Sequence, residues 1–129
     1  MSSLIVKQSV SSYADTMRAL LAAIERRGLR VFARIDHAAA AHEVGMELEE
    51  EEVVLFGNPS AGTPLMQSDR SVGIDLPLRI LVWREGEQTL LGHGDPRSLS
   101  GTYDLAQHAA VLEQMANLLE QLVAEAAGR

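Results

Sequence analysis

Two short segments of the chain hold residue types that could do chemistry. In the first, Asp36 and His37 adjoin at the end of a predicted strand, where a carboxylate could orient an imidazole and raise its basicity. Adjacent residues on a strand point in opposite directions, so this acid–base pair works only if the chain turns there. The interpretation that we favour is structural: Asp36 caps a short helix that begins at His37.

The second segment, Gly57 to Thr63, joins a predicted buried strand to a predicted helix with Thr63 as N-cap and Pro64 as first residue. Free backbone N–H groups and the helix dipole could hold a small anion there. The alternative is a shaped turn closed by a threonine cap. We expect the two segments to line one pocket at one edge of the sheet. The predicted ligand-binding residues are Asp36, His37, Asn58, Gly62, Thr63 and Met66.

A metal site is not predicted from the histidines, which are His37, His42, His93 and His108. No two of them have the i, i+4 spacing that places two imidazoles on one face of a helix. Met66 could add a soft ligand for copper, but methionine more often fills a core. His108 falls within the apolar stripe of the last predicted helix, which favours a structural role. We assign no cofactor and no catalytic residue.

Composition excludes several classes of function. The 129 residues contain no cysteine, so thiol catalysis, thiolate metal sites and disulfides are absent. No nucleophile elbow, P-loop or dinucleotide-binding motif occurs. A formal net charge of −7 and an aromatic content of 4% argue against a nucleic-acid partner. The apolar runs are too short to span a membrane, and nothing resembles a signal peptide, so a cytoplasmic protein is expected.

The order of strand and helix patterns predicts a single α+β domain over residues 1–129. Ser12 caps a predicted helix from Tyr13 to Arg27, and an alternating strand follows from Leu29 to Asp36. A hairpin is expected from Leu78 to Leu91. The fold class is two-layer, with a mainly antiparallel sheet of four or five strands and the first and last helices on one face. The residues expected to be buried include Leu20, Ile24, Leu55, Ile80, Val82, Leu112 and Leu119.

The last predicted helix, from about Asp104 to Ala126, is apolar over an unusually wide face. One row of residues has the spacing of a coiled-coil seam, and a second row, Val111, Met115, Leu118 and Leu122, lies beside it. Either this helix fills a groove between the sheet and the first helix, or one row packs on a second subunit. We favour a homodimer through this helix.

Three blocks of sequence resemble a known family. The residues are Arg27–Leu29 with Val31–Ala39, then Phe56–Pro59 with Gly62–Met66 and Asp75–Leu78, and finally Asp95–Pro96. Together they resemble the uncharacterised family known as domain of unknown function 302. The resemblance implies a compact α+β fold with helices packed on one sheet and a homodimer, but no established substrate, cofactor or catalytic residue. The acidic run Glu49–Glu52 is more extreme than the family pattern, and we attach no function to it.

Four functions are compatible with these observations. The first is a small-molecule or anion-binding module, because polar residues gather at strand ends in a chain without a catalytic motif. The others are a structural dimeric partner, an enzyme that uses Asp36 and His37 as an acid–base pair, and a metal protein. A convergent cleft would favour the enzyme, and ligand side chains within bonding distance would favour the metal protein.

Overall fold

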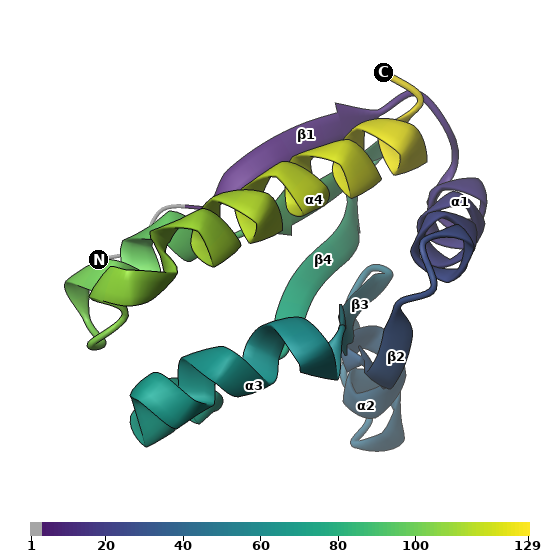
Figure 1. Ribbon diagram of the computed structural model, residues 1–129. Helices are drawn as coiled ribbons and strands as arrows, with labels where there is room; N and C mark the ends of the chain where they lie inside the picture. Colours follow the sequence, from purple (N-terminus) through teal and green to yellow (C-terminus); the bar gives the residue numbers. More distant parts are fainter. Residues whose placement is uncertain (1–3) are drawn as a thin grey trace.

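A five-stranded antiparallel sheet forms the centre of the fold (Figure 1). The computed structural model describes residues 4–129, and the strands lie in the order β1-β5-β4-β3-β2. Their bounds are β1 Ile5–Ser9, β2 Arg30–Asp36, β3 Glu51–Gly57, β4 Leu78–Glu85 and β5 Gln88–His93. Each neighbouring pair is antiparallel, including the β4–β5 hairpin. The predicted α+β class and antiparallel sheet are therefore confirmed.

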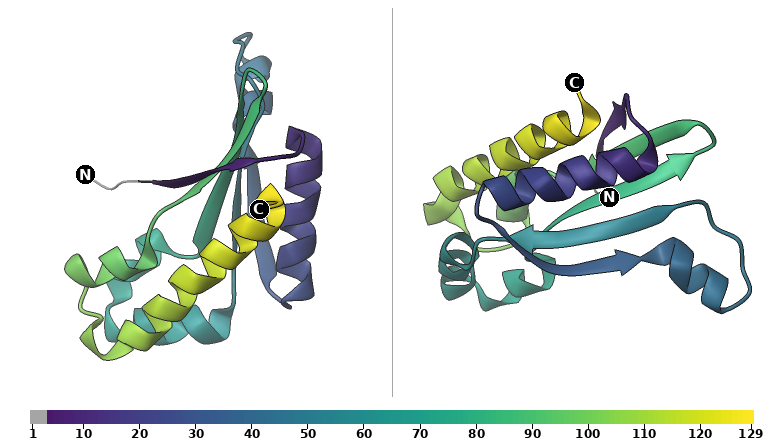
Figure 2. Two further views of the ribbon diagram at one scale, coloured as in Figure 1. Left: turned by 90° about the horizontal axis from the view of Figure 1, so that it is seen from above. Right: turned by 90° about the vertical axis from the view of Figure 1, so that its right-hand side faces the viewer.

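Two long helices, α1 (Tyr13–Arg26) and α4 (Ala109–Ala127), pack against each other and on one face of the sheet. The right-hand view of Figure 2 shows α1 running in roughly the same direction as the strands, while β2 forms an edge of the sheet. The shorter elements are the helices α2 (His37–Glu43) and α3 (Pro59–Ser68) and the 3₁₀ turns η1 (Arg70–Asp75), η2 (Pro96–Gly101) and η3 (Ala106–His108). The predicted placement of the first and last helices on one face is confirmed.

Local sequence signals account for the position of α1. The hydroxyl of Ser12 accepts a hydrogen bond from the Asp15 backbone N–H at 3.1 Å, which satisfies one of the free donors at the helix start. The helix ends at Arg26, and Gly28, two residues later, has a φ of +68°, a left-handed conformation that favours glycine. Between these ends, Leu20 and Ile24 are fully buried. Each contributes about 1.5–3 kcal/mol through burial of its side chain.

The helix α4 begins five residues later than the sequence predicts, because η3 precedes it. Both of its apolar rows face its own chain: Met115 and Leu122 of the second row are buried, and Val111 and Leu118 are half-buried. The width of the apolar stripe is therefore largely explained by packing within one chain. A dimer through α4 stays a prediction. The wide apolar stripe that motivated it is explained by packing within one chain.

A β-bulge in β2 changes which side of the sheet its residues face. Val31 pairs with Phe56 and shares the helix-covered face, whereas Ala33 pairs with Leu55 on the opposite face. The regular alternation in the sequence predicts one face for Val31, Ala33 and Ile35, which is wrong beyond the bulge. Every residue of β2 is exposed.

The side of the sheet away from α1 and α4 is called here the open face. Its residues follow from the strand register, in which opposite partners share a side. They are Val6, Gln8, Arg30, Ala33, Ile35, Glu51, Val53, Leu55, Gly57, Arg79, Leu81, Trp83, Glu85, Gln88, Leu90 and Gly92. Leu55 was expected in the core, but it lies on this face and is only half-buried. In the left-hand view of Figure 2, α1 lies along one side of the sheet.

Candidate functional site

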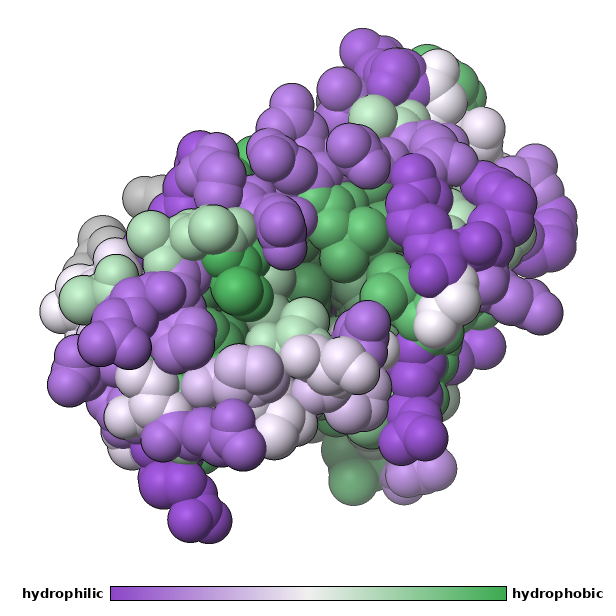
Figure 3. All heavy atoms as spheres, viewed as in Figure 1, coloured by the Kyte–Doolittle hydropathy of each residue, from purple (hydrophilic) through white to green (hydrophobic). Residues whose placement is uncertain are grey.

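A cavity of about 320 Å³ lies where the end of β3, the start of β4, α3 and α4 meet. Figure 3 shows this hollow near the centre of the view, with hydrophobic side chains at its base. Fourteen residues line it: Leu29, Phe32, Gly57, Asn58, Pro59, Ala61, Gly62, Thr63, Met66, Leu76, Pro77, Leu78, Met115 and Leu118. Only Asn58 and Thr63 among them have polar side chains, so the cavity is predominantly apolar.

The helix α3 begins at the glycine-rich segment, but at a different residue from the one predicted. Asn58 is the N-cap: its Oδ1 accepts a hydrogen bond from the Ser60 backbone N–H at 2.9 Å. Pro59 occupies the first helical position, where the missing N–H of proline has no intrahelical partner to lose. Thr63 and Pro64 lie inside the helix, so the prediction that they begin it is wrong. Asn58-Pro59 and Thr63-Pro64 are both sequences that can begin a helix, and in the structure the helix begins at the first of them.

The first N–H groups of α3 are already paired. The Asn58 carbonyl accepts from Ala61 at 2.9 Å and from Gly62 at 3.1 Å, and the Asn58 side chain satisfies Ser60. Pro59 has no N–H to offer. The helix start therefore presents few free donors to an anion, in contrast to what the sequence suggested.

The predicted site residues separate into two groups. Asn58, Gly62, Thr63 and Met66 all line the cavity. Asp36 and His37 do not, because β2 and β3 run antiparallel: Asp36 pairs with Glu52, whereas Gly57 pairs with Arg30. Six residues of strand separate the two ends, which is about 20 Å. The expectation that both segments line one pocket is therefore wrong.

Asp36 takes the structural role that the sequence also allowed. Its carboxylate accepts a hydrogen bond from the Ala39 backbone N–H at 2.9 Å and so caps α2. His37 is the first residue of that helix and is exposed. The chain turns at this point, yet Asp36 is occupied by the cap.

A second, more polar hollow lies beside α1 and α2 and contains Asp36, Tyr13 and Glu52. Glu52 is buried and forms a two-pronged contact with the Arg34 guanidinium, at 2.5 Å to Nε and 3.2 Å to Nη2. This hydrogen bond raises the pKa of Arg34. Burial, followed by the nearby charge of Glu52, raises the pKa of the Tyr13 hydroxyl above its usual range. Arg34 and Glu52 form an ion pair that joins β2 to β3.

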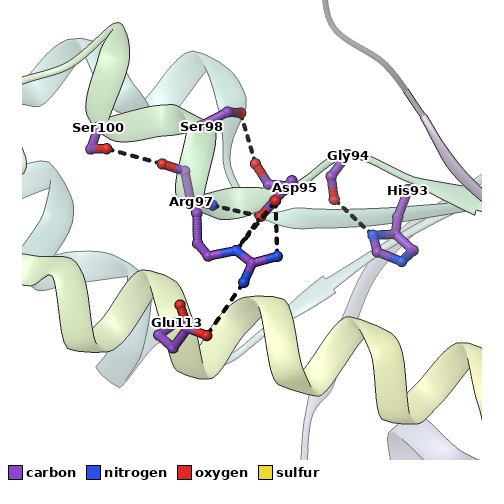
Figure 4. Close-up of polar contacts among 7 residues, drawn as sticks. All are labelled: His93, Gly94, Asp95, Arg97, Ser98, Ser100 and Glu113. Carbon is purple, nitrogen blue, oxygen red and sulfur yellow. Dashed lines mark hydrogen bonds and ion pairs between the residues drawn. The ribbon is translucent and has the colours of Figure 1, made fainter.

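The remaining histidines occupy separate parts of the fold. His93 is buried at the end of β5, with Nδ1 2.7 Å from the Gly94 carbonyl oxygen, so this nitrogen must carry the donated hydrogen (Figure 4). Beyond it, the Arg97 guanidinium contacts Asp95 and Glu113, and its hydrogen bond holds the pKa of Asp95 below the usual range. Within residues 4–129, no three His, Asp or Glu side chains converge to a possible metal site.

Half of the cavity lining was missed from the sequence. Leu29, Leu76, Pro77 and Leu118 come from three distant parts of the chain, and they meet only after the sheet and α4 are packed. The second apolar row of α4 was the available signal, since it carries Met115 and Leu118. The dimer prediction instead explains the width of the apolar face by the packing of one of its two rows on a second subunit.

Comparison of the whole chain with known proteins identifies a family that it matches. The model of the family described as "Domain of unknown function DUF302" matches residues 5–122. The chain belongs to this family. The DUF302 fold also appears in the crystal structure of an uncharacterised conserved DUF302 protein from Bacillus stearothermophilus, which is 16% identical, with a TM-score of 0.85 over 95% of this chain and 97% of that one.

Curated relatives of this DUF302 chain have a different kind of name. A protein named "Fluoride-specific ion channel FluC 1" in Brucella suis is 40% identical over 105 residues, which is 81% of this chain and 41% of the relative. The protein of the same name in Brucella abortus is also 40% identical over 105 residues, or 39% of its length. This chain thus spans about two fifths of those relatives. None of the helices in residues 4–129 is long and apolar enough to cross a membrane.

Proposed function

We propose that this DUF302 chain binds a small, largely apolar molecule in the cavity between β3, β4, α3 and α4. The observation that carries the proposal is the lining: twelve of the fourteen residues have no polar side-chain group capable of strong hydrogen bonding. A cavity of about 320 Å³ is at the small end of the range of about 300–1,000 Å³ that is typical of ligand sites.

The same geometry sets the polarity of the ligand. A purely anionic ligand would need several free donors, and the start of α3 has paired its own amides. The Asn58 carboxamide oxygen is used by Ser60, which leaves its nitrogen as the donor that a ligand would meet. Asn58 and Thr63 are both exposed, so they lie at the mouth rather than the base of the cavity. A ligand with an apolar body and one terminal hydroxyl, amide or carboxylate fits this arrangement.

Three features allow the cavity to adapt to the shape of its ligand. Met66 and Met115 are flexible side chains that repack at low cost. A Cβ at Gly62 would meet only Leu76, at 3.8 Å, so the wall there is held back by the absence of a side chain. Flexible walls are typical of a binding site for a class of molecules.

The proposal is tested by thermal-shift and calorimetric titration with four probes: 1-decanol, indole, decanoate and inorganic phosphate. We expect 1-decanol, indole or decanoate to raise the melting temperature, and phosphate to leave it unchanged. Gly62→Phe should remove the ligand-induced stabilisation, because the new ring fills the cavity. The matched control is Gly94→Phe, since a Cβ at Gly94 meets nothing within 4 Å.

Two results would contradict the proposal. One is binding of phosphate without binding of any apolar probe, which would return the site to the anion-binding interpretation. The other is equal ligand-induced stabilisation in the wild type and in a folded Gly62→Phe variant.

A further inference from the structure

The polar hollow beside α1 and α2 shares no residue with the apolar cavity and has the opposite chemistry. Its volume is about 410 Å³, and it lies where β2 ends and β3 begins. Ten residues line it: Tyr13, Ala14, Met17, Asp36, Ala38, Ala39, His42, Glu50, Glu51 and Glu52. Four of the ten carry carboxylates and none is lysine or arginine, so the lining as a whole is acidic.

Two of these carboxylates lie on the side of the sheet that α1 covers. Asp36 and Glu52 are opposite partners of the β2–β3 ladder and therefore share a side. Glu51 is in register with Trp83 and belongs to the open face, so its charge is not counted here. Arg34 contacts both carboxylate oxygens of Glu52 and neutralises it. Asp36 forms no ion pair with any residue of the described chain 4–129.

Glu50 adds a second carboxylate with an unused oxygen. Its Oε1 accepts a hydrogen bond from Nε of Arg84 at 3.1 Å, and Arg84 also contacts Glu49 at 2.9 Å, so one guanidinium serves two carboxylates. Asp36 likewise uses only Oδ1, which caps α2. Asp36 lies opposite Glu52, and Glu50 is two residues before Glu52, so the two backbone positions are diagonal neighbours about 7–8 Å apart. Two separate acceptors of negative charge therefore border the hollow.

Tyr13 brings an unpartnered hydroxyl into the hollow. The residue is only 9% exposed, and its hydroxyl forms no hydrogen bond within residues 4–129; burial and charges alone act on it. Every side-chain nitrogen or oxygen of these residues that is shut off from solvent has a hydrogen-bond partner. The Tyr13 oxygen has none, so it opens onto the hollow that the residue lines. Because buried polar groups are normally hydrogen-bonded, this hydroxyl is available to a molecule in the hollow.

The electrostatic potential at this hydroxyl is negative. Burial first, and then the charges of Glu52, Asp36 and Glu50, raise the pKa of Tyr13, and only the charge of Arg34 acts in the opposite sense. The hydroxyl is therefore neutral at pH 7 and can offer its lone pairs to a donor. The same carboxylates repel an anion and attract a cation.

The arrangement suits an organic cation better than a metal ion. Within residues 4–129, no three His, Asp or Glu side chains converge closely enough to ligate one ion. Ammonium groups need only hydrogen-bond acceptors, and two separated acceptors suit the two ends of one molecule. The remaining lining includes the apolar side chains of Ala14, Met17, Ala38 and Ala39, which provide surface for methylene groups.

We propose that the hollow between α1, α2 and the adjoining end of the sheet binds a small alkyl diamine, with its two ammonium groups on the carboxylates of Asp36 and Glu50. One ammonium group donates to Oδ2 of Asp36 and the other to Oε2 of Glu50, and the Tyr13 hydroxyl accepts a further N–H bond. Two positive charges balance the two carboxylates in excess: Asp36 and one of the pair that shares Arg84. This site is independent of the apolar cavity and of the function proposed for it.

The test is calorimetric titration of the full chain with 1,4-diaminobutane at low ionic strength, beside butylamine, 1,4-butanediol and Mg²⁺ as comparison probes. We expect 1,4-diaminobutane to bind saturably, with one molecule per chain. Butylamine should bind about 10-fold more weakly, because it lacks the second charged donor, and 1,4-butanediol should not bind. Mg²⁺ carries the same charge as the diamine without its length or its N–H donors, and it should also bind about 10-fold more weakly or less.

Two substitutions test the residues of the hollow. Tyr13→Phe and Asp36→Asn should each weaken the binding of 1,4-diaminobutane by about 10-fold. Asparagine removes the charge of Asp36 but keeps an oxygen that can cap α2, so this variant serves if Tyr13→Phe fails to fold. The matched controls are Tyr103→Phe, whose hydroxyl bonds Asp75 outside the hollow, and Glu87→Gln, an exposed residue of the turn between β4 and β5. Both controls should bind the diamine as the wild type does.

Absence of saturable binding of 1,4-diaminobutane to the wild type overturns the proposal. Equal affinity for Mg²⁺ or butylamine also overturns it, because attraction to an acidic surface then accounts for the binding. Unchanged affinity in both folded variants, Tyr13→Phe and Asp36→Asn, would place the diamine elsewhere on the chain. Gly62→Phe separates the two proposed sites: it fills the apolar cavity and should leave diamine binding unchanged, and loss of binding there would assign the diamine to that cavity.

Discussion

The indole of Trp83 on β4 lies across the backbone of Gly92 on β5. A Cβ at Gly92 would be 3.0 Å from Cζ3 and 3.2 Å from Cη2 of the ring, closer than carbon atoms approach without displacement. The Leu4 side chain lies 3.7 Å from the same position. The indole Nε1 donates to the Glu85 carboxylate at 2.9 Å, which fixes the other edge of the ring. Glycine at position 92 is therefore favoured by the close approach of the indole and not by its backbone conformation, since its φ is not in the left-handed region.

The Gly92→Ala variant should lose about 1–3 kcal/mol of unfolding free energy, because the added methyl displaces the rigid indole. Its tryptophan emission should change with it. Urea denaturation and fluorescence measure both effects.

The control is Gly94→Ala, where the methyl meets nothing within 4 Å and the stability should stay equal or rise slightly. In a Trp83→Leu background, Gly92→Ala should become nearly neutral. A full penalty in that background would show that the indole is not the cause.

The start of α3 gives a second prediction. Asn58→Ala should cost about 1 kcal/mol, because the Ser60 N–H loses the side-chain oxygen that caps it. Thr63→Ala should change stability by less than about 0.5 kcal/mol, since Thr63 is an exposed residue inside the helix. Chemical denaturation of the two variants measures both, and Asn58→Asp should restore most of the loss. The opposite ranking would make Thr63 the cap.

The buried hydroxyl of Tyr13 predicts a loss of stability in alkali. Its folded-state pKa is raised by burial first and by the Glu52 charge second, so the folded state holds the proton more tightly than the unfolded state. The contribution is fully present below the unfolded pKa of about 10 and is lost as pH rises through the folded value. Denaturation between pH 8 and pH 11 should show this decline.

Tyr13→Phe should flatten that decline, whereas Tyr103→Phe should retain the part that arises from Tyr13. Tyr103 has its own raised pKa through a hydrogen bond to Asp75, so the two variants separate the two sources. An unchanged alkaline slope in Tyr13→Phe would contradict the assignment.

At the acid end, Glu125 links α4 to α1. It contacts Arg27 and Arg26, and hydrogen bonds from these two guanidinium groups hold its pKa below the usual range. Its contribution is present above the unfolded pKa of about 4.3 and is lost as pH falls through the folded value. Glu125→Gln should therefore lower stability at pH 7 and match the wild type near pH 2. Glu120→Gln, which changes another exposed glutamate of α4, is the control and should follow the wild type throughout.

Many local features of this protein could be predicted because their causes are close in sequence. Ser12 caps α1, Asp36 caps α2, and the β4–β5 hairpin forms where its alternating strands flank a glycine turn. The seam of α4, including Leu112 and Leu119, is buried as its spacing indicates. In each case the interacting residues are a few positions apart, so one pattern of side chains decides between alternatives.

Tertiary structure decided what those patterns leave open. Asn58 and Thr63 both precede a proline, and each could begin a helix; the chain path from β3 into α3 selects Asn58. The cavity arises from Leu29, Leu76 and Leu118, which lie far apart in sequence and meet only when α4 and the sheet are in place.

The sequence by itself determined the α+β class, the main helices and strands, and most of the core, because these depend on local periodicity and capping. It could not place Asp36 relative to Gly57, since both strand directions are compatible with the same alternation. The antiparallel pairing of β2 with β3 puts them at opposite ends of the sheet. Nor could it tell which apolar residues of β2 face the core, because a single bulged residue reverses the side of every residue after it.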